Sequence, residues 1–498
     1  MSQVPASRIS GRTRDFWLAA SLVGIVLRLI LLPLSPRCGF INDHDDLARW
    51  SIQAVDKGVL TLYDGPPPRW NLVVWRPEGP TVLQRNFDSI CAYPPATAYV
   101  LWACGVAFKA ISPDRLINTP TSRTIFALPA IAADLLLAAG CTAIVSTYRP
   151  SRAARWAYLG VLLLPPFLWN TSVWGQIDSL PLAAATWMIV ALIRHRWIAA
   201  GALLALTAML KPQAVLFLPV WLLVVVLSRP IWKPLLALCI AALVAFLIAL
   251  PFTLHSGLRW WQISYVTNIL SGYPNTTLMA FNLWYPDVLT SGSDDALALW
   301  HGLSKDVWGK LLLGATLLGG FIWMLRRWCK DDRAILPWTV WTTLAAVMLP
   351  TRVHERYLLL VLPFLVAAAA LHRRFVPGLI LLLVVATAQV TWPVWLRAEP
   401  TAIASLGVNA KTEYQTWRDS MPPQQRDAAL PLKDFVETLR ADLQDRRAAT
   451  VRYEWLFVGL ALVAYVLTAG VILSLRPVPT ASPESAASKT FYPTLGAA

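Results

Sequence analysis

About twelve separate apolar stretches fill this chain, and its charged residues lie almost entirely between them. A helix needs about 20 mainly apolar residues to cross a bilayer, and charged side chains are costly inside hydrocarbon. The hydrophobic fraction is 56% and the charged fraction only 14%, whereas soluble domains average about 25% charged residues. The pattern therefore predicts an all-α polytopic membrane protein with about twelve transmembrane helices and additional juxtamembrane helices on the outer face.

Several predicted spans are shorter than a full crossing, which suits half-helices or helices that border a water-filled cavity. The predicted spans cover residues 16–35, 125–145, 153–169, 180–193, 197–210, 214–227, 231–254, 308–325, 335–350, 357–371, 375–395 and 455–475.

Basic residues in the short loops set the expected orientation, because such residues favour the cytoplasmic side. With Arg8, Arg12 and Arg14 inside, the later basic loops alternate correctly only if the apolar segment 93–111 does not cross. We therefore expect this segment to be an outer juxtamembrane helix. The alternative, a true crossing, would place most later basic loops outside.

This topology predicts one transmembrane catalytic domain over residues 1–475 and a disordered cytoplasmic tail over 476–498. The stretch 432–447 is expected to form a small helical cap. The expected outer loops are 36–122, 170–179, 255–307, 350–356 and 396–453.

The net charge of +15 lies largely in short loops, as the positive-inside rule produces, and this argues against nucleic-acid binding. The six cysteines form no metal-binding pattern. Cys38 and Cys91 share the first outer loop, where an oxidising environment would permit a disulfide between them.

An acidic group opens the first outer loop, with Asp43, Asp45 and Asp46 flanking His44. Carboxylates this close repel one another, which favours the proton uptake that a general base needs. A solvated acidic loop and a divalent metal site remain alternatives.

Two later turns carry polar residues between apolar spans. Gln176 and Asp178 follow a Trp-Gly pair and suit sugar hydroxyls, although a plain connecting turn fits equally well. Lys211, in Lys-Pro-Gln, interrupts a long apolar run and offers an ammonium to a lipid phosphate. The alternative is a lysine that snorkels at a tight turn.

The segment Arg352–Tyr357 places two guanidiniums and an imidazole at the mouth of two spans, which makes a fork for a phosphate. Ordinary headgroup contacts are the alternative, but basic residues on an outer face are unusual. Asp134 lies within a span and needs a partner on another helix, because Arg123 is about 16 Å away along the same helix.

In their order, these motifs resemble the GT-C superfamily of polytopic glycosyltransferases. The nearest similarity is to the dolichyl-phosphate-glucose-dependent glucosyltransferases of asparagine-linked glycosylation and their bacterial relatives. The matches are an acidic residue seven positions before a tryptophan (Asp43, Trp50) with a second at Asp45, Tyr-Pro-Pro-x-Thr-Ala-Tyr at 93–99, Trp-Gly-Gln-x-Asp at 174–178, Lys-x-Gln at 211–213, Phe-Asn-Leu-Trp at 281–284, and His-Glu-Arg at 354–356.

The resemblance implies an inverting transfer of a hexose from a polyprenyl-phosphate sugar to an acceptor hydroxyl, with Asp43 as the catalytic base. It implies no metal or other cofactor. The residues expected to bind the donor phosphate are Lys211, His354 and Arg356, and those expected to bind substrate are Asp45, Tyr93, Gln176, Asp178, Gln213 and Glu355.

The implied partners are the lipid-linked donor, a glycan or lipid-linked glycan acceptor, and the bilayer. The composition favours a bacterial inner membrane, and the basic loops predict that both termini are cytoplasmic and that the active site is on the periplasmic face. A lipid-linked glycan flippase or another polytopic transporter is the rival class, although carriers keep their sites at the bilayer midplane between repeated halves. A ligase with a diphosphate-linked donor is a second rival.

Overall fold

The computed structural model describes residues 11–67, 70–76, 79–85, 90–149, 151–228, 230–271, 273–290, 294–328, 332–396, 418 and 431–476. Helices make up most of these residues, and the strands that are described form two-stranded pairs. This architecture confirms the predicted all-α polytopic fold.

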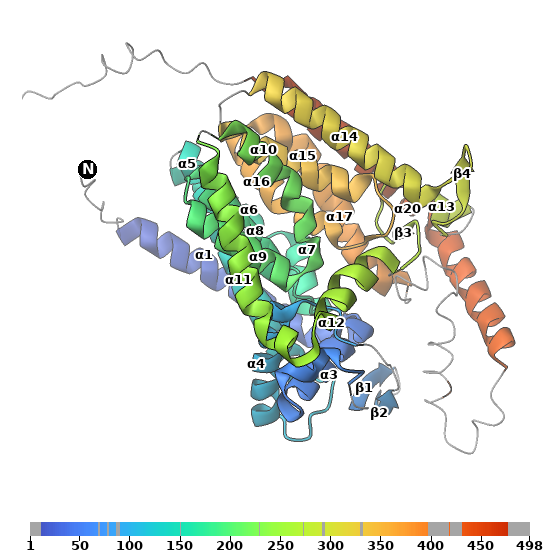
Figure 1. Ribbon diagram of the computed structural model, residues 1–498. Helices are drawn as coiled ribbons and strands as arrows, with labels where there is room; N and C mark the ends of the chain where they lie inside the picture. Colours follow the sequence, from blue (N-terminus) through green and yellow to red (C-terminus); the bar gives the residue numbers. More distant parts are fainter. Residues whose placement is uncertain are drawn as a thin grey trace, which may run out of the picture.

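Apolar helices packed side by side form the main body of the protein (Figure 1). Their buried side chains form one large cluster that continues from α5 and α8 to α15, α16 and α17. These helices and their short extensions are α1 (Gly11–Leu31), η1 (Leu32–Leu34), α5 (Pro120–Tyr148), α6 (Ser151–Leu162), α7 (Pro165–Leu168), η3 (Trp169–Trp174), α8 (Ser179–Ile193), α9 (Trp197–Leu210), η4 (Pro212–Phe217), α10 (Leu218–Leu227), α11 (Trp232–Ser256), α14 (Lys305–Arg327), η6 (Asp332–Ala334), α15 (Ile335–Met348), η7 (Tyr357–Leu360), α16 (Leu362–Leu371), η8 (Arg373–Phe375), α17 (Val376–Leu396) and α20 (Leu432–Ser474).

Small residues allow close contact between these helices. A Cβ atom at Gly201 of α9 would lie 2.1 Å from the carbonyl oxygen of Ala237 on α11, so only glycine fits there. Such contacts are typical of membrane helices, whose association depends on van der Waals packing because lipid is as apolar as the side chains.

The first long loop folds into a separate layer at the lower end of the bundle in Figure 1. Its hairpin is antiparallel, with Trp70 opposite Arg85 and Arg76 opposite Gly79. A second apolar cluster holds this layer against the ends of α9 and α11. The layer consists of α2 (Ser35–Cys38), α3 (Ile41–Asp56), η2 (Val59–Tyr63), β1 (Trp70–Arg76), β2 (Gly79–Arg85) and α4 (Pro95–Ile111).

The expected spans coincide with helices throughout. Among the described residues, six helical segments are long and apolar enough to cross a membrane: Asp15–Cys38, Pro120–Tyr148, Trp232–Ser256, Lys305–Arg327, Arg373–Val394 and Ala448–Ser474. Shorter apolar helices occupy most of the other predicted spans. How many of the helices cross the bilayer stays a prediction.

The segment 93–111 lies in the lower layer, where α4 packs along α3 (Figure 1). Near the end of α4, Lys109 Nζ lies 3.2 Å from an oxygen of Asp56 at the end of α3. This packing agrees with the juxtamembrane position, which stays a prediction. Cys38 and Cys91, in the same layer, are both free thiols.

The charged stretch 432–447 is continuous with the last apolar span in α20, so it is not a separate cap. The buried Glu454 of α20 accepts a hydrogen bond from Tyr285 Oη at 2.8 Å, which fixes α13 (Tyr285–Thr290) on this helix. Most of the predicted loop 396–453 and of the predicted disordered tail lies outside the described residues.

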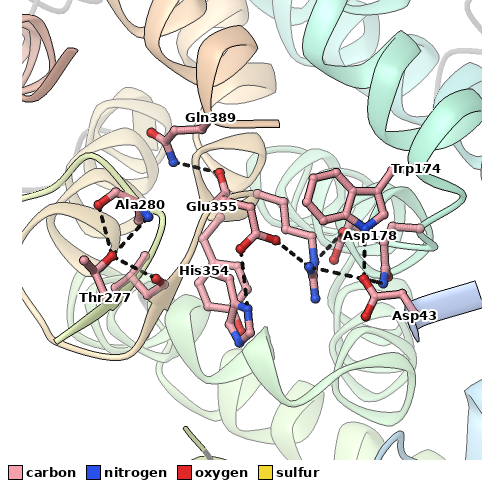
Figure 2. A network of polar contacts seen from close by, with 12 residues as sticks. Asp43, Trp174, Asp178, Thr277, Ala280, His354, Glu355 and Gln389 are labelled. Atoms are coloured by element: carbon pink, nitrogen blue, oxygen red, sulfur yellow. Dashed lines mark hydrogen bonds and ion pairs between the residues drawn. The ribbon is translucent and has the colours of Figure 1, made fainter. Parts of the chain in front are cut away.

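Two distant loops are joined by a parallel pair of short strands, β3 (Thr277–Leu278) and β6 (Val353–His354). Thr277 Oγ1 donates to the carbonyl oxygens of Ala280 and Val353 at 3.0 and 3.2 Å. This pairing fixes the backbone on both sides of His354 (Figure 2). The remaining described elements are α12 (Arg259–Trp261), η5 (Gln262–Ser271), β4 (Ala298–Trp300) and β5 (Leu303–Ser304).

Candidate active site

Asp43 lies in the first turn of α3, where the partial positive charge of the helix terminus favours a carboxylate. Its Oδ2 atom accepts hydrogen bonds from Trp174 Nε1 at 2.9 Å and from Gln176 Nε2 at 2.5 Å. Arg356 Nη1 lies 3.5 Å from the same oxygen. Asp43 thus brings together three segments that are far apart in sequence (Figure 2).

Trp174 is the last residue of a π-helix, η3, and Gln176 follows it directly after the capping residue Gly175. Gly175 has a φ of 84°, a left-handed conformation that glycine adopts without steric cost. The N–H groups of Gly175 and Gln176 both donate to the carbonyl oxygen of Asn170 at 3.0 Å. This turn places Trp174 and Gln176 on Asp43 and brings Asp178 next to Arg356.

Arg356 is the central cation of the site. Its guanidinium nitrogens lie 2.6 Å from Glu355 Oε1, 3.4 Å from Asp178 Oδ2 and 3.5 Å from Asp43 Oδ2. Its Cζ atom lies 5.8 Å from the centre of the Trp174 ring, in a cation–π contact. The arginine therefore links residues from the first loop, from η3 and from its own loop.

Lys211 is the second cation of the site, and it lies at the break between α9 and η4. Its ammonium donates a hydrogen bond to Asp178 Oδ1 and lies 5.2 Å from the centre of the Tyr93 ring. Two residues later, Gln213 Nε2 donates to Tyr357 Oη at 2.9 Å. The interruption of the apolar run thus places polar side chains within the cluster.

His354 and Glu355 complete the cluster. The Glu355 N–H donates to the carbonyl oxygen of Leu278 at 2.8 Å, and Gln389 Nε2 donates to the Glu355 carbonyl oxygen at 2.7 Å. His354 Nδ1 lies 3.8 Å from Glu355 Oε2, and its ring contacts those of Tyr273 and Tyr357.

The two cations retain unused hydrogen-bond donors. Among the described residues, none accepts a hydrogen bond from Arg356 Nη2, and Asp178 is the only acceptor for the Lys211 ammonium. A guanidinium has five N–H donors and an ammonium has three. Both side chains therefore have N–H groups left for an anionic ligand.

Burial and the neighbouring charges shift the pKa values of these groups. Burial lowers the pKa of Lys211, and Asp178 offsets this effect only in part. Burial alone would raise the pKa of Asp178, but Lys211 and Arg356 hold it below its usual range. Burial likewise acts to raise the pKa of Glu355, and Arg356 outweighs that effect. Both carboxylates are therefore ionised at neutral pH.

No group of three or more His, Cys, Asp or Glu side chains within the described ranges could hold a metal ion. Asp43, Asp178 and Glu355 instead each lie within 3.5 Å of Arg356. Its guanidinium occupies the position that a cation between these carboxylates would take.

Asp45, expected to bind substrate, lies apart from this cluster. Its carboxylate is buried, 3.3 Å from Arg49 Nε one helical turn later. Asp46 lies 3.4 Å from Arg49 Nη2, so a shared arginine relieves the expected repulsion. Consecutive positions on a helix point in different directions, and Asp43 lies 3.5 Å from Arg356, whereas Asp45 and Asp46 contact Arg49.

Arg352 does not join the expected phosphate fork. Its side-chain Nε atom lies 2.5 Å from Asp295 Oδ2, and its backbone N–H donates to the carbonyl oxygens of Asn275 and Thr276. Arg352 therefore anchors the loop that carries His354 and Arg356.

The Phe-Asn-Leu-Trp motif also has a supporting position. Asn282 Nδ2 donates to the carbonyl oxygens of Val347 and Pro350 at 3.3 Å, and Trp284 Nε1 donates to that of Leu349 at 2.7 Å. These buried contacts secure the end of α15 just before the Arg352 loop.

Sequence reasoning did not select Trp174, Tyr357 or Gln389 as site residues. Trp174 was visible as part of the Trp-Gly-Gln-x-Asp motif, and Tyr357 ends the Arg352–Tyr357 segment. Gln389 is an amide within an apolar span, and such a polar residue is itself a functional signal.

The buried Asp134 finds its partner on α1. Arg28 Nε lies 2.7 Å from Asp134 Oδ2, and Thr171 Oγ1 donates to the same oxygen at 2.9 Å. Ser179 Oγ donates to Asp134 Oδ1. Asp134 therefore holds both ends of the 170–178 segment.

The family model of glycosyltransferase family 87 matches residues 92–351. This range includes Tyr93, Gln176, Asp178, Lys211 and Gln213. Asp43 lies before it, and His354 to Arg356 follow it.

The chain is also similar to two solved structures. ArnT from Cupriavidus metallidurans, bound to undecaprenyl phosphate, is 13% identical with a TM-score of 0.46, over 92% of this chain and 78% of that one. The Archaeoglobus fulgidus oligosaccharyltransferase in its apo form is 13% identical with a TM-score of 0.37, over 95% and 57% of the two chains. No curated protein matches the chain.

Proposed function

Because the chain belongs to glycosyltransferase family 87, we propose that it transfers a hexose from a polyprenyl-phosphate sugar to an acceptor hydroxyl, with inversion, at the non-cytoplasmic membrane face. Family membership confirms the recognition of a polytopic glycosyltransferase from its motifs. It also favours an enzyme over the transporter considered from the sequence.

The observation that carries this proposal is the contact of Asp43 with Trp174, Gln176 and Arg356 in one cluster. The Asp43 side chain is 23% exposed, whereas those of Asp178 and Glu355 are 8% and 1% exposed. Asp43 is thus the carboxylate of this cluster that an acceptor can reach most easily, while the other two hold the cations in place.

In the proposed reaction, Asp43 accepts the proton of the acceptor hydroxyl. The hydroxyl oxygen attacks the anomeric carbon from the face opposite the phosphate, and the bond from that carbon to the phosphate oxygen breaks. Polyprenyl phosphate leaves with the electron pair, so the configuration inverts. General base catalysis of this kind contributes typically about 10²–10⁴-fold to a rate.

Lys211, Arg356 and His354 are the proposed ligands of the donor phosphate. The unused N–H groups of Lys211 and Arg356 can donate to phosphate oxygens as negative charge grows on the leaving group. Donors fixed before the reaction contribute about 3–4 kcal/mol each in comparable sites. Asp178 and Glu355 orient these cations and are proposed positioning residues.

The place of Lys211 suits a donor whose tail is a lipid. The residue lies where the apolar helices α9 and α10 are interrupted, so a phosphate there would extend its polyprenyl chain along apolar surface. Polar backbone at the end of a broken helix is a common form of binding site in membrane proteins.

The test is the substitution Asp43→Asn in purified protein, assayed for transfer from a panel of polyprenyl-phosphate sugars. We expect transfer to fall by at least about 10²-fold while donor binding persists, because the amide keeps the shape but accepts no proton. Asp46→Asn, in the same helix, is the matched control and should retain activity. Near-normal transfer by Asp43→Asn would show that the base is another group.

A further inference from the structure

A groove between α6 and α17 lies outside the proposed active site. It has a volume of about 730 Å³. One wall comes from α6 and the other from α17, with α16 between them. Its lining residues are Arg149, Arg152, Ala153, Trp156, Gly160, Leu164, Val366, Ala369, Ala370, Leu371, Arg373, Val376, Leu379 and Leu383.

The lining is sharply divided between charge and apolar surface. Arg149, Arg152 and Arg373 are all exposed, and they lie at the ends of helices where the groove begins. The rest of the lining is apolar, and it includes Trp156, which is 62% exposed. Three guanidiniums at one end of an apolar groove complement a molecule with an anionic head and a hydrocarbon tail.

The length of the groove matches one leaflet. From Arg373 to Leu383 the chain rises about 15 Å at 1.5 Å per residue. This is about half of the 30 Å hydrocarbon thickness of a bilayer. A groove of this length that begins at the headgroup level would reach about the bilayer centre.

Helix α5 separates this groove from the proposed active site. Near its start, Arg123 donates to the carbonyl oxygen of Trp174, whereas Arg149 directly follows its end. The helix has 29 residues, which corresponds to about 43 Å. Arg149, with the two arginines that line the groove beside it, thus lies at the opposite end of α5 from the Asp43 cluster.

We propose that this groove binds an anionic glycerophospholipid of the leaflet opposite the active site. Arg149, Arg152 and Arg373 hold its phosphate, and one acyl chain lies over Gly160, Val366 and Leu379. This ligand is distinct from the proposed donor, whose phosphate lies at the other face.

Native mass spectrometry of full-length protein, released from nanodiscs of phosphatidylcholine with or without phosphatidylglycerol, tests the proposal. We expect retained phosphatidylglycerol on the unchanged protein and at least about a fivefold loss in the triple variant R149Q/R152Q/R373Q. The matched triple variant R196Q/K233Q/R326Q removes the same charge from outside the groove and should retain the lipid. Equal loss in both would show general charge attraction and overturn the proposal.

A second variant keeps every charge and fills the groove. A Cβ at Gly160 would contact only Val366, at 3.0 Å, so the side chain in Gly160→Leu would extend into the groove. We expect this variant to lose phosphatidylglycerol. Gly314→Leu on α14 is its control, because nothing lies within 4 Å of a Cβ there. Full retention by Gly160→Leu would overturn the proposal.

Competition distinguishes the other ligands. Inorganic phosphate at millimolar concentration should not displace phosphatidylglycerol, because it gains nothing from the apolar wall. Displacement by inorganic phosphate would reduce the groove to an anion site. Undecaprenyl phosphate that displaces the bound phosphatidylglycerol, and is not displaced when phosphatidylglycerol is added again, would assign the groove to the polyprenyl carrier. Either result would overturn the phospholipid assignment.

Discussion

Arg356 and Lys211 determine the charge balance of the cluster. Asp43, Asp178 and Glu355 supply three carboxylates, and these two residues supply the positive charges that contact them. The carboxylates compensate the buried cations before any donor arrives. A donor phosphate then binds fixed, partly paired N–H groups, which need little reorganisation as charge moves onto the leaving oxygen.

Loss of the Lys211 proton should weaken binding of the donor phosphate at alkaline pH. Burial lowers its pKa, so it loses its proton at a lower pH than an exposed lysine, whose pKa is about 10.4. Below the lowered pKa the ammonium can bind a phosphate, and above it the neutral amine cannot. We expect the affinity for polyprenyl phosphate to fall as the pH rises through this pKa, and the fall to move to higher pH in Lys211→Arg. Titration calorimetry from about pH 7 to pH 10 would measure both proteins.

The two tyrosines near the donor site, Tyr93 and Tyr273, should not contribute to this alkaline pH dependence. Burial raises the pKa of Tyr93 well above its ordinary value and that of Tyr273 to about 12. Neither phenol should ionise in the range of the titration. If the affinity for polyprenyl phosphate falls at the same alkaline pH in the unchanged protein and in Lys211→Arg, the role given to Lys211 is contradicted.

At the scale of elements, one buried ion pair holds the 170–178 segment in position. Asp134 of α5 contacts Thr171 and Ser179, on either side of the residues that meet Asp43, and Arg28 of α1 neutralises it. Arg28 also donates to the carbonyl oxygen of Leu162 at 3.0 Å. The geometry of the cluster therefore depends on contacts between α1, α5 and α6 that no substrate touches.

Removal of one partner of this pair should be more damaging than removal of both. Asp134→Leu leaves Arg28 buried without its counter-ion, and we expect a loss of about 3–5 kcal/mol in stability. Arg28→Met/Asp134→Leu removes both charges and should recover part of that loss. Thermal unfolding in detergent measures all three proteins. A double variant as unstable as Asp134→Leu would contradict a compensating pair.

The sequence predicted the helices well and the partners of single residues poorly. Apolar runs determine the spans, and Lys-Pro-Gln at 211–213 marked a helix break that the structure has. Asp45 could not be separated from Asp43, because the difference depends on where α3 begins and which face it presents. Arg352 was expected in the phosphate fork, because the sequence around it does not show that Asp295, in a distant loop, is its partner.

At the scale of the whole molecule, two ends of the bundle carry different chemistry. The cluster uses the start of α8, the end of α9 and the loop before α16, so it lies at one end of all three. The turn from Arg194 to Arg196 joins the other ends of α8 and α9, and the phospholipid groove lies at the end of α5. This separation is what an enzyme needs if it acts at one membrane surface and is anchored at the other.

Labelling of intact cells tests the orientation without any assay of activity. Lys57 is exposed just after α3, in the layer that carries Asp43, and Arg196 is exposed between α8 and α9. In a chain whose native cysteines are replaced, we expect a membrane-impermeant maleimide to label Lys57→Cys directly. It should label Arg196→Cys only after permeabilisation, because basic turns favour the cytoplasmic side. The reverse pattern would place the cluster in the cytoplasm, and labelling of both positions from outside would show that α8 and α9 do not separate the two surfaces.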